Sequence, residues 1–151
     1  MLVSQKSQYA LRAIFELAKE YGKGPTKIAH IAEAQAIPVR FLEVILVHLK
    51  RGGFAVSQRG KEGGYFLIRP PEGLTVGELL RFVEGPIDPV DCMTPTRKAK
   101  ARCSLEGACV FVDLWQNVRD AISSVYDNTT IKDLVEREDR RAKRHVASYT
   151  I

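Results

Sequence analysis

The chain has 151 residues, 45% of them hydrophobic and 27% charged, with a formal net charge of +5. This composition is typical of a soluble globular protein of one or two small domains. No run of about 18 or more apolar residues occurs and the first residues lack a signal-peptide layout, so we expect a cytoplasmic protein with no transmembrane helix and no membrane partner.

Helical spacing of apolar residues predicts three helices in the first third of the chain. Ser4 is a suitable N-cap for the first helix, and Thr26 is a suitable N-cap for a short second one. Pro38 suits the first position of the third helix, where its missing N–H does no harm. The apolar residues expected on the buried face of this third helix are Phe41, Leu42, Ile45, Leu46 and Leu49.

The periodicity then changes from helical to alternating, as in strands. Phe54 and Val56, and then Tyr65 and Leu67, alternate with polar residues on either side of the glycine-rich run 57–64. Three helices followed by such a hairpin predict a winged helix-turn-helix domain in residues 1–70. The predicted fold class is therefore mostly α with a small β-hairpin wing, completed by a long C-terminal dimerisation helix.

The rest of the chain divides into three predicted segments. Residues 71–107 hold a helix opened by a capping box at Thr75, and then a long loop with two of the three cysteines. Residues 108–137 predict a long dimerisation helix and a short following helix, which a second capping box opens at Thr130. Residues 138–151 form a charged tail, which we expect to be frayed.

The long helix carries a nearly continuous apolar stripe that needs a partner surface. The small domain can cover part of this stripe, and the same helix of a second copy can cover the rest, which predicts a two-fold homodimer. The expected interface residues are Leu114, Trp115, Val118, Ile122 and Val125.

The net positive charge is confined to the N-terminal part of the chain. Residues 1–70 carry 11 Lys and Arg against 5 Asp and Glu, a net of +6, whereas residues 71–151 carry 12 against 13, a net of −1. A polyanion such as double-stranded DNA is the expected partner of the basic part, although a solvated basic surface would have the same composition.

Candidate DNA contacts lie on the third helix and the hairpin. Arg40 and Glu43 lie one turn apart where base edges are usually reached, with a surface ion pair as an equal alternative. Arg59 is followed by Gly60 at the hairpin tip, where an arginine can enter a narrow minor groove. Further phosphate or base contacts are expected from Ser4, Lys6, Tyr9, Lys50, Arg51, Gln58 and Lys61.

Three cysteines, Cys92, Cys103 and Cys109, lie close together in the sequence. An odd number in a cytosolic chain disfavours a disulfide framework, and the clustering favours a metal or redox site. Thiolates are soft ligands suited to iron–sulfur clusters and zinc, but no CxxC pair typical of structural zinc is present. Free thiols, redox-active or inert, are the alternative.

Several blocks of the sequence resemble the Rrf2 family of bacterial regulators (IscR/NsrR/CymR-like). The wing block SQRGKEGGYFL at 57–67 is the most specific, and further blocks extend the resemblance over roughly residues 1–137. The resemblance implies a homodimeric repressor or activator, in which Glu43 and Arg59 match positions used for operator recognition. Pro38 and Arg40 stand where family members often have Ser or Thr, so the operator sequence cannot be transferred.

The resemblance also implies a role for the cysteines, because cluster-bearing members carry three in the loop before the dimer helix. It therefore implies a [2Fe–2S] or [4Fe–4S] cluster on the three cysteines, although the gap of ten residues before Cys103 is longer than in the best-known members. Val112 and Gln8 stand where two branches of the family supply a fourth ligand. The remaining candidates for that ligand are Asp91, Glu106, Asp113, His30, His48 and His145.

The predicted function is a dimeric transcription regulator that senses redox state, nitric oxide or iron–sulfur status. One alternative is a cluster-free family member that senses a small molecule, thiol oxidation or a partner protein. Another is a protein-interaction or metal-handling module without DNA binding. An enzyme is disfavoured, because no Ser-His-Asp order, phosphate-binding glycine loop or paired-carboxylate pocket stands out.

Overall fold

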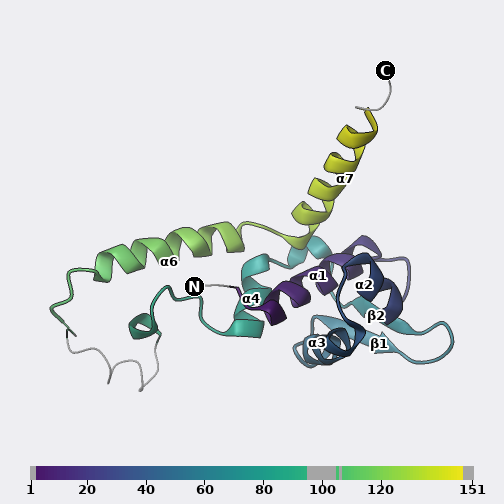
Figure 1. The fold of residues 1–151 in the computed structure, drawn as a ribbon, viewed down its shortest axis with the longest axis horizontal. Coiled ribbons are helices and arrows are strands. Elements are labelled where there is room, and N and C mark those ends of the chain that lie inside the picture. Colours follow the sequence, from purple (N-terminus) through teal and green to yellow (C-terminus); the bar gives the residue numbers. More distant parts are fainter. Residues whose placement is uncertain (1–2, 95–104, 106, 148–151) are drawn as a thin grey trace.

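A computed structural model describes residues 3–94, 105 and 107–147, with side chains in the last helix described as far as residue 144. In Figure 1, the first four helices and the hairpin form one body. Helix α6 extends to one side of this body, and helix α7 projects from it in another direction. None of the described helices has the length and hydropathy needed to cross a membrane.

The first three helices are α1 (Gln5–Lys19), α2 (Ile28–Ala34) and α3 (Val39–Arg51). Ser4 caps α1 as predicted, because its side chain accepts a hydrogen bond from the backbone N–H of Ser7. The prediction that Thr26 caps α2 is wrong, since Lys27 occupies that position. Thr26 instead exchanges two backbone hydrogen bonds with Tyr65, which hold it in extended conformation.

The turn between α2 and α3 is compact and contains the only described non-glycine residue with a positive φ, Ala36 at +48°. The backbone N–H of Ile37 returns to the carbonyl of Ala32 at 2.9 Å, and the Ile37 side chain is buried. Pro38 is the N-cap of α3 and so precedes the helix by one residue. These contacts fix the orientation of α3 relative to α2.

The core lies between α1, α3 and α4. The predicted buried face of α3 is confirmed for Leu42, Ile45, Leu46 and Leu49. The prediction is wrong for Phe41, which is 47% exposed. The buried stripe of α3 consists of Leu42 and of residues three, four and seven positions after it. Phe41 does not share this spacing, so its ring lies on the outside of the domain.

The hairpin consists of β1 (Ala55–Gln58) and β2 (Gly64–Leu67), which pair antiparallel with Ala55 opposite Leu67 and Gln58 opposite Gly64. The backbone of Thr26 pairs with the other edge of β2. A Cβ at Gly64 would overlap the Thr26 carbonyl, so only glycine allows this close approach. The hairpin is thereby attached to the segment just before α2.

Helix α4 (Val76–Glu84) is capped as predicted, because Thr75 Oγ1 accepts from the backbone N–H of Glu78 at 3.1 Å. It ends at Gly85, which has a φ of +92°. Two short 3₁₀ turns flank it, η1 (Pro71–Gly73) and η2 (Asp91–Met93).

Helix α6 (Val112–Asp127) begins four residues later than the expected start near Ala108. None of its residues is fully buried within the chain. Its end is tied to α4 by a bidentate ion pair, in which the Arg81 guanidinium contacts the two oxygens of Asp127 at 2.6 and 2.7 Å. The chain alone therefore fixes this long helix mainly at its C-terminal end.

Helix α7 (Ile131–Ala147) begins with the predicted capping box, in which Thr130 and Asp133 each accept a hydrogen bond from the other's backbone N–H. The expectation of a short helix and a frayed tail is wrong as far as Ala147. The added turns contain many residues of good helix propensity, and they are supported by the ion pairs Glu136–Arg140 and Lys19–Glu138. Residues 148–151 of the predicted tail lie outside the described residues.

Candidate nucleic-acid interface

The outer face of α3 combines charged residues with exposed valines. Arg40 and Glu43 are both exposed, and none of the ion pairs among the described residues joins them. The Arg40 guanidinium lies over the ring of Phe41, 4.8 Å from its centroid. Val44 is 67% exposed and Val47 is 42% exposed, so neither contributes to the core.

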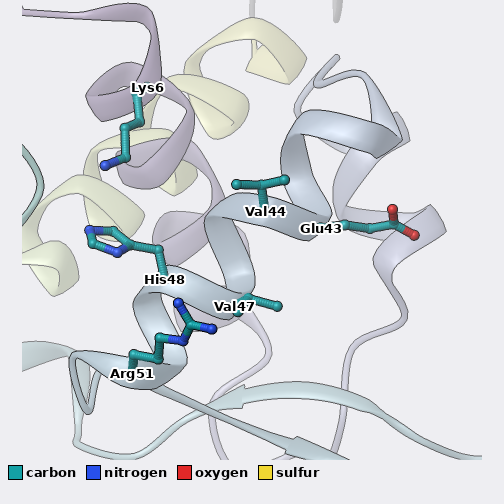
Figure 2. Close-up of a pocket in the computed structure, with 6 residues that line it drawn as sticks. All are labelled: Lys6, Glu43, Val44, Val47, His48 and Arg51. Carbon is teal, nitrogen blue, oxygen red and sulfur yellow. The ribbon is translucent and has the colours of Figure 1, made fainter.

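A shallow depression of about 370 Å³ lies between the start of α1 and α3. It is lined by Lys6 from α1 and by five residues of α3: Glu43, Val44, Val47, His48 and Arg51. Figure 2 shows that Lys6 extends toward His48, whereas Glu43 points away from Lys6. The fold thus brings Lys6, Glu43 and Arg51, which were predicted as DNA contacts, to one surface.

His48 forms the inner wall of this depression. Its ring stacks on Phe82 of α4 with a centroid distance of 4.5 Å. Nε2 of His48 is buried without a hydrogen-bond partner among the described residues. Burial of the ring, and then the positive charges of Lys6 and Arg51, lower the pKa of His48. The imidazole is therefore neutral at neutral pH.

The wing presents its predicted contact residues to solvent. Gln58, Arg59, Gly60 and Lys61 are all exposed. Gly60 has a φ of +111°, which a residue with a side chain rarely adopts. A Cβ at Gly63 would overlap the carbonyl of Gln58, so the tight loop also requires glycine there. The loop backbone thus holds the two cations at the tip.

Three other predicted contacts already have partners within the chain. Lys50 donates to Ser57 Oγ at 2.6 Å and thereby connects α3 to the wing. The Ser4 hydroxyl caps α1, and the backbone N–H of Ser4 donates to Oε1 of Glu84 at 2.9 Å. The ring of Tyr9 is half-buried, and its centroid lies 6.4 Å from the centroid of the Phe41 ring.

Two of the three cysteines belong to the described residues. Cys92 is an exposed free thiol in η2, and Cys109 is a half-buried free thiol just before α6. Cys103 and Glu106 lie outside the described residues, as does the side chain of His145. Among the side chains that the structure describes, no three His, Cys, Asp or Glu form a group able to hold a metal ion. The two accessible thiols nevertheless have the donor chemistry that an iron–sulfur cluster requires.

Helix α6 exposes much of its apolar stripe. Leu114 is 51% exposed and Val125 is 64% exposed. Trp115 and Val118 are half-buried, and Ile122 packs against the core of its own chain. Four of the five predicted interface residues thus leave apolar surface without contact to the core cluster.

The helix-turn-helix of α2 and α3, followed by a basic glycine-rich hairpin, defines a winged helix-turn-helix protein. The profile of the Rrf2 family, described as an iron-dependent transcriptional regulator, matches residues 3–137. The chain belongs to this family. Its predicted class, a transcriptional regulator and not an enzyme, is thereby confirmed.

Named relatives support this assignment over nearly the whole chain. The transcriptional regulator CymR of Bacillus subtilis is 36% identical over 139 residues, which cover 92% of this chain and 93% of the relative. The transcriptional regulator IscR of Yersinia pseudotuberculosis is 30% identical over 139 residues, which cover 92% of this chain and 82% of the relative.

Solved structures share the fold. The structure of CymR, the global cysteine regulator of B. subtilis, has a TM-score of 0.73 at 35% identity and covers 91% of this chain and 98% of its own. The structure of T. potens IscR has a TM-score of 0.69 at 30% identity, covering 91% and 88%. The oxidized form of Staphylococcus aureus CymR has a TM-score of 0.68 at 33% identity, covering 90% and 97%.

The sequence analysis assigned no DNA contact to Val44, Val47 or His48, and it considered His48 only as a candidate fourth ligand of a cluster. The signal that could have identified them is that all three lie outside the helical spacing of the buried residues. The depression that they form depends on Lys6 reaching across from α1, and a tertiary contact of this kind has no counterpart in helical periodicity.

Proposed function

We propose that this protein is a homodimeric transcription regulator that binds operator DNA through α3 and the wing, with an affinity set by its cysteine loop. The observation that supports it most is that α3 shares a depression with Lys6 on its outer face and is joined to strand β1 of the wing by the Lys50–Ser57 hydrogen bond. An exposed helix with cations on the elements to either side of it suits a DNA groove.

Each part of this surface has a proposed role. Arg40 and Glu43 read base edges in the major groove, where Arg pairs with guanine and Glu accepts from cytosine. The exposed Val44 and Val47 contact thymine methyl groups. Arg59 enters the adjacent minor groove from the tip of the wing.

Further contacts hold the protein to the DNA backbone. Lys6 and Arg51 contact phosphates at the edge of the depression, and Gln58 and Lys61 contact the DNA beside Arg59. Ser4, Tyr9 and Lys50 already make contacts within the chain. Their polar groups contact DNA phosphates in addition.

The dimer follows from the unpartnered face of α6. Leu114, Trp115, Val118 and Val125 would pack on the same residues of a second copy, with Ile122 linking this interface to the core. Two copies related by a two-fold axis would present two copies of α3 to a pseudo-palindromic operator.

The sensor is proposed to be the loop that contains Cys92, Cys103 and Cys109, which would hold an iron–sulfur cluster. When bound, such a cluster supplies a group that reacts with oxidants or nitric oxide. The loop joins α4, which packs on the DNA-binding domain, to α6, which carries the dimer contacts. Its ordering would set the angle between the two wings and hence the spacing of half-sites.

A cluster-free form of the same mechanism has its own support. Cys92 is an exposed thiol, and the chain is similar to CymR, for which an oxidized form has been solved. In this alternative the loop responds to thiol oxidation, a small molecule or a partner protein.

An anaerobic purification with an absorbance spectrum and iron and sulfide analysis tests the sensor. A coloured protein that bleaches with oxygen or nitric oxide, and loses its iron in Cys103→Ser, is the expected result. A colourless protein without iron, even after reconstitution, would contradict the cluster and leave the thiol alternative. Substitution of all three cysteines that leaves the operator affinity unchanged under all redox conditions would contradict both the cluster and the sensing of thiol oxidation.

A further inference from the structure

Glu16 is a buried carboxylate of the DNA-binding domain that takes no part in the proposed DNA surface. It lies on the buried side of α1 and is only 2% exposed. A carboxylate that is removed from water is unfavourable unless hydrogen bonds and opposite charges compensate it. The partners of Glu16 therefore indicate what the fold gains from placing it there.

Both oxygens of Glu16 have partners within the chain. Nε2 of Gln35 donates to Oε2 at 2.7 Å, and Nε2 of His30 on α2 lies 3.3 Å from Oε1. Nζ of Lys19 lies 3.4 Å from Oε2 of Glu16 and 3.0 Å from a carboxylate oxygen of Glu138 on α7. Glu16 is thus joined to α2 directly and to α7 through Lys19.

Gln35 is the nearest of these partners, and it begins the turn that leads to α3. It is the C-cap of α2, and the guanidinium of Arg12 donates to its backbone carbonyl. Arg12 and Glu16 are one helical turn apart, so α1 holds both the backbone and the side chain of Gln35. The next residue is Ala36, whose φ of +48° is uncommon for a residue other than glycine. A turn with such a conformation needs support from its surroundings.

Stability alone is a poor explanation for this arrangement. Replacement of a buried ion pair by apolar residues of similar volume is often neutral or even stabilising. Hydrogen bonds differ from apolar contacts because they depend on direction as well as distance. The contacts of Glu16 with Gln35 and His30 therefore favour one geometry of the segment that precedes α3.

We propose that Glu16 is a positioning residue for DNA recognition, which holds the turn before α3 and so sets the orientation of this helix. Base edges are read through hydrogen bonds of defined geometry, so a small rotation of α3 removes them. Phosphate contacts depend mainly on charge and tolerate such a rotation better. The effect on DNA binding rests on the proposed function, whereas the effect on the turn does not.

The first test is amide hydrogen exchange of the full-length protein without DNA, in Glu16→Gln and in its matched control Glu20→Gln. Each of these glutamates lies 3.4 Å from a lysine three residues later, and each change removes one carboxylate. The backbone N–H groups of Gln35 and Ile37 bond to carbonyls of α2 and report on the turn. In Glu16→Gln they should exchange about tenfold faster relative to amides within α1, because a charge-assisted hydrogen bond becomes a neutral one. Glu20→Gln should leave them unchanged.

The second test compares a duplex selected from a randomised pool with an unrelated duplex of the same length. Glu16→Gln should weaken binding to the selected duplex about tenfold and binding to the unrelated one less than about twofold. The double variant Glu16→Gln with Gln35→Glu exchanges the amide and the carboxylate and keeps the net charge of the wild type. It should recover most of the protection at Ile37 and most of the affinity for the selected duplex.

Equal exchange of the turn amides in Glu16→Gln and Glu20→Gln would overturn the proposal. An equal loss of affinity for both duplexes, or no recovery in the double variant, would also overturn it. Should Glu16→Gln fail to fold, Gln35→Ala removes the same hydrogen bond but leaves the carboxylate its other partners, and it must speed exchange at Ile37 for the proposal to stand. If the wild type binds no duplex specifically, the proposed function fails, and the exchange measurement still decides whether Glu16 holds the turn.

Discussion

His48 stands between the candidate DNA surface and the core. One side of its ring packs on Phe82, which in turn lies 4.9 Å from the ring of Phe54 between centroids. Its other neighbours include the cations Lys6 and Arg51, which share the depression on α3. A single residue thus connects the stability of the domain to the electrostatics of its binding face.

The first prediction concerns pH. Burial and the two cations lower the pKa of His48 from its usual 6.5, so the unfolded state takes up the proton at a higher pH than the folded state. The free energy of unfolding should therefore decrease as the pH falls below about 6.5 toward the folded pKa. His48→Gln should reduce this slope in urea titrations between about pH 7 and 5. His30→Gln is the control, and an equal slope in wild type and His48→Gln would contradict the assignment.

The second prediction concerns Gly52, where a Cβ would overlap the Phe82 ring. Gly52→Ala should destabilise the domain by about 1–3 kcal/mol, because the ring must leave its stack with His48 and Phe54. Gly73→Ala is a matched control, since a Cβ at Gly73 meets no atom, and it should change stability by less than about 0.5 kcal/mol. Urea denaturation of both variants distinguishes the two outcomes, and equal stabilities would contradict the packing argument.

At the scale of whole elements, α6 differs from the other helices because none of its residues is buried within the chain. The Arg81–Asp127 ion pair and the packing of Ile122 hold its C-terminal end. The N-terminal part, with Leu114 exposed, has little to cover it among the described residues. Such a helix gains its stabilising contacts from a second copy.

The third prediction tests that surface. Leu114→Asp should shift the protein from dimer to monomer in light scattering coupled to size-exclusion chromatography, because a charge in an apolar interface core is unfavourable. The helical content should change little, since Leu114 is already 51% exposed in the single chain. Ser124→Asp places the same charge on α6 outside the apolar stripe and should remain dimeric. A dimeric Leu114→Asp variant would refute the interface.

Elements fixed by local chemistry were predictable from the sequence. The caps at Ser4, Thr75 and Thr130 depend on residues three positions apart, and all three form as predicted. Thr26 and Phe41 were misassigned for a different reason, since their environments depend on contacts distant in sequence. Thr26 pairs with β2, and Phe41 lies outside the stripe that the body of the domain selects on α3.

The candidate site divides in the same way. The glycines and cations of the wing identify their loop from sequence alone, because the turn requires positive φ at Gly60 and leaves no room for a side chain at Gly63. The depression beside Lys6 could not be predicted, because it joins side chains of α1 and α3 that only the tertiary fold brings together. Helix α7 extends further than predicted, and one of the contacts that support its added turns is the ion pair between Glu138 and Lys19 of α1. This too is a tertiary contact that the local sequence does not reveal.

At the scale of the whole molecule, α3 and the wing lie together, and α7 projects from the body in a different direction (Figure 1). Both regions are rich in cations, so total charge alone does not identify the DNA-binding face. The account assigns operator binding to α3 and the wing, and it assigns no DNA contact to Arg141 on the exposed surface of α7.

The most direct test is to select duplexes from a randomised pool with the wild-type protein and measure their affinity by fluorescence anisotropy over a range of salt concentrations. We predict a pseudo-palindromic sequence, an affinity that falls steeply with salt, and a loss of about 1–3 kcal/mol in Arg59→Ala. Arg141→Ala removes the same charge from α7 and should bind like wild type. Equal affinities of Arg59→Ala and wild type, or the absence of salt-dependent binding to any duplex, would contradict the central claim that α3 and the wing bind the operator.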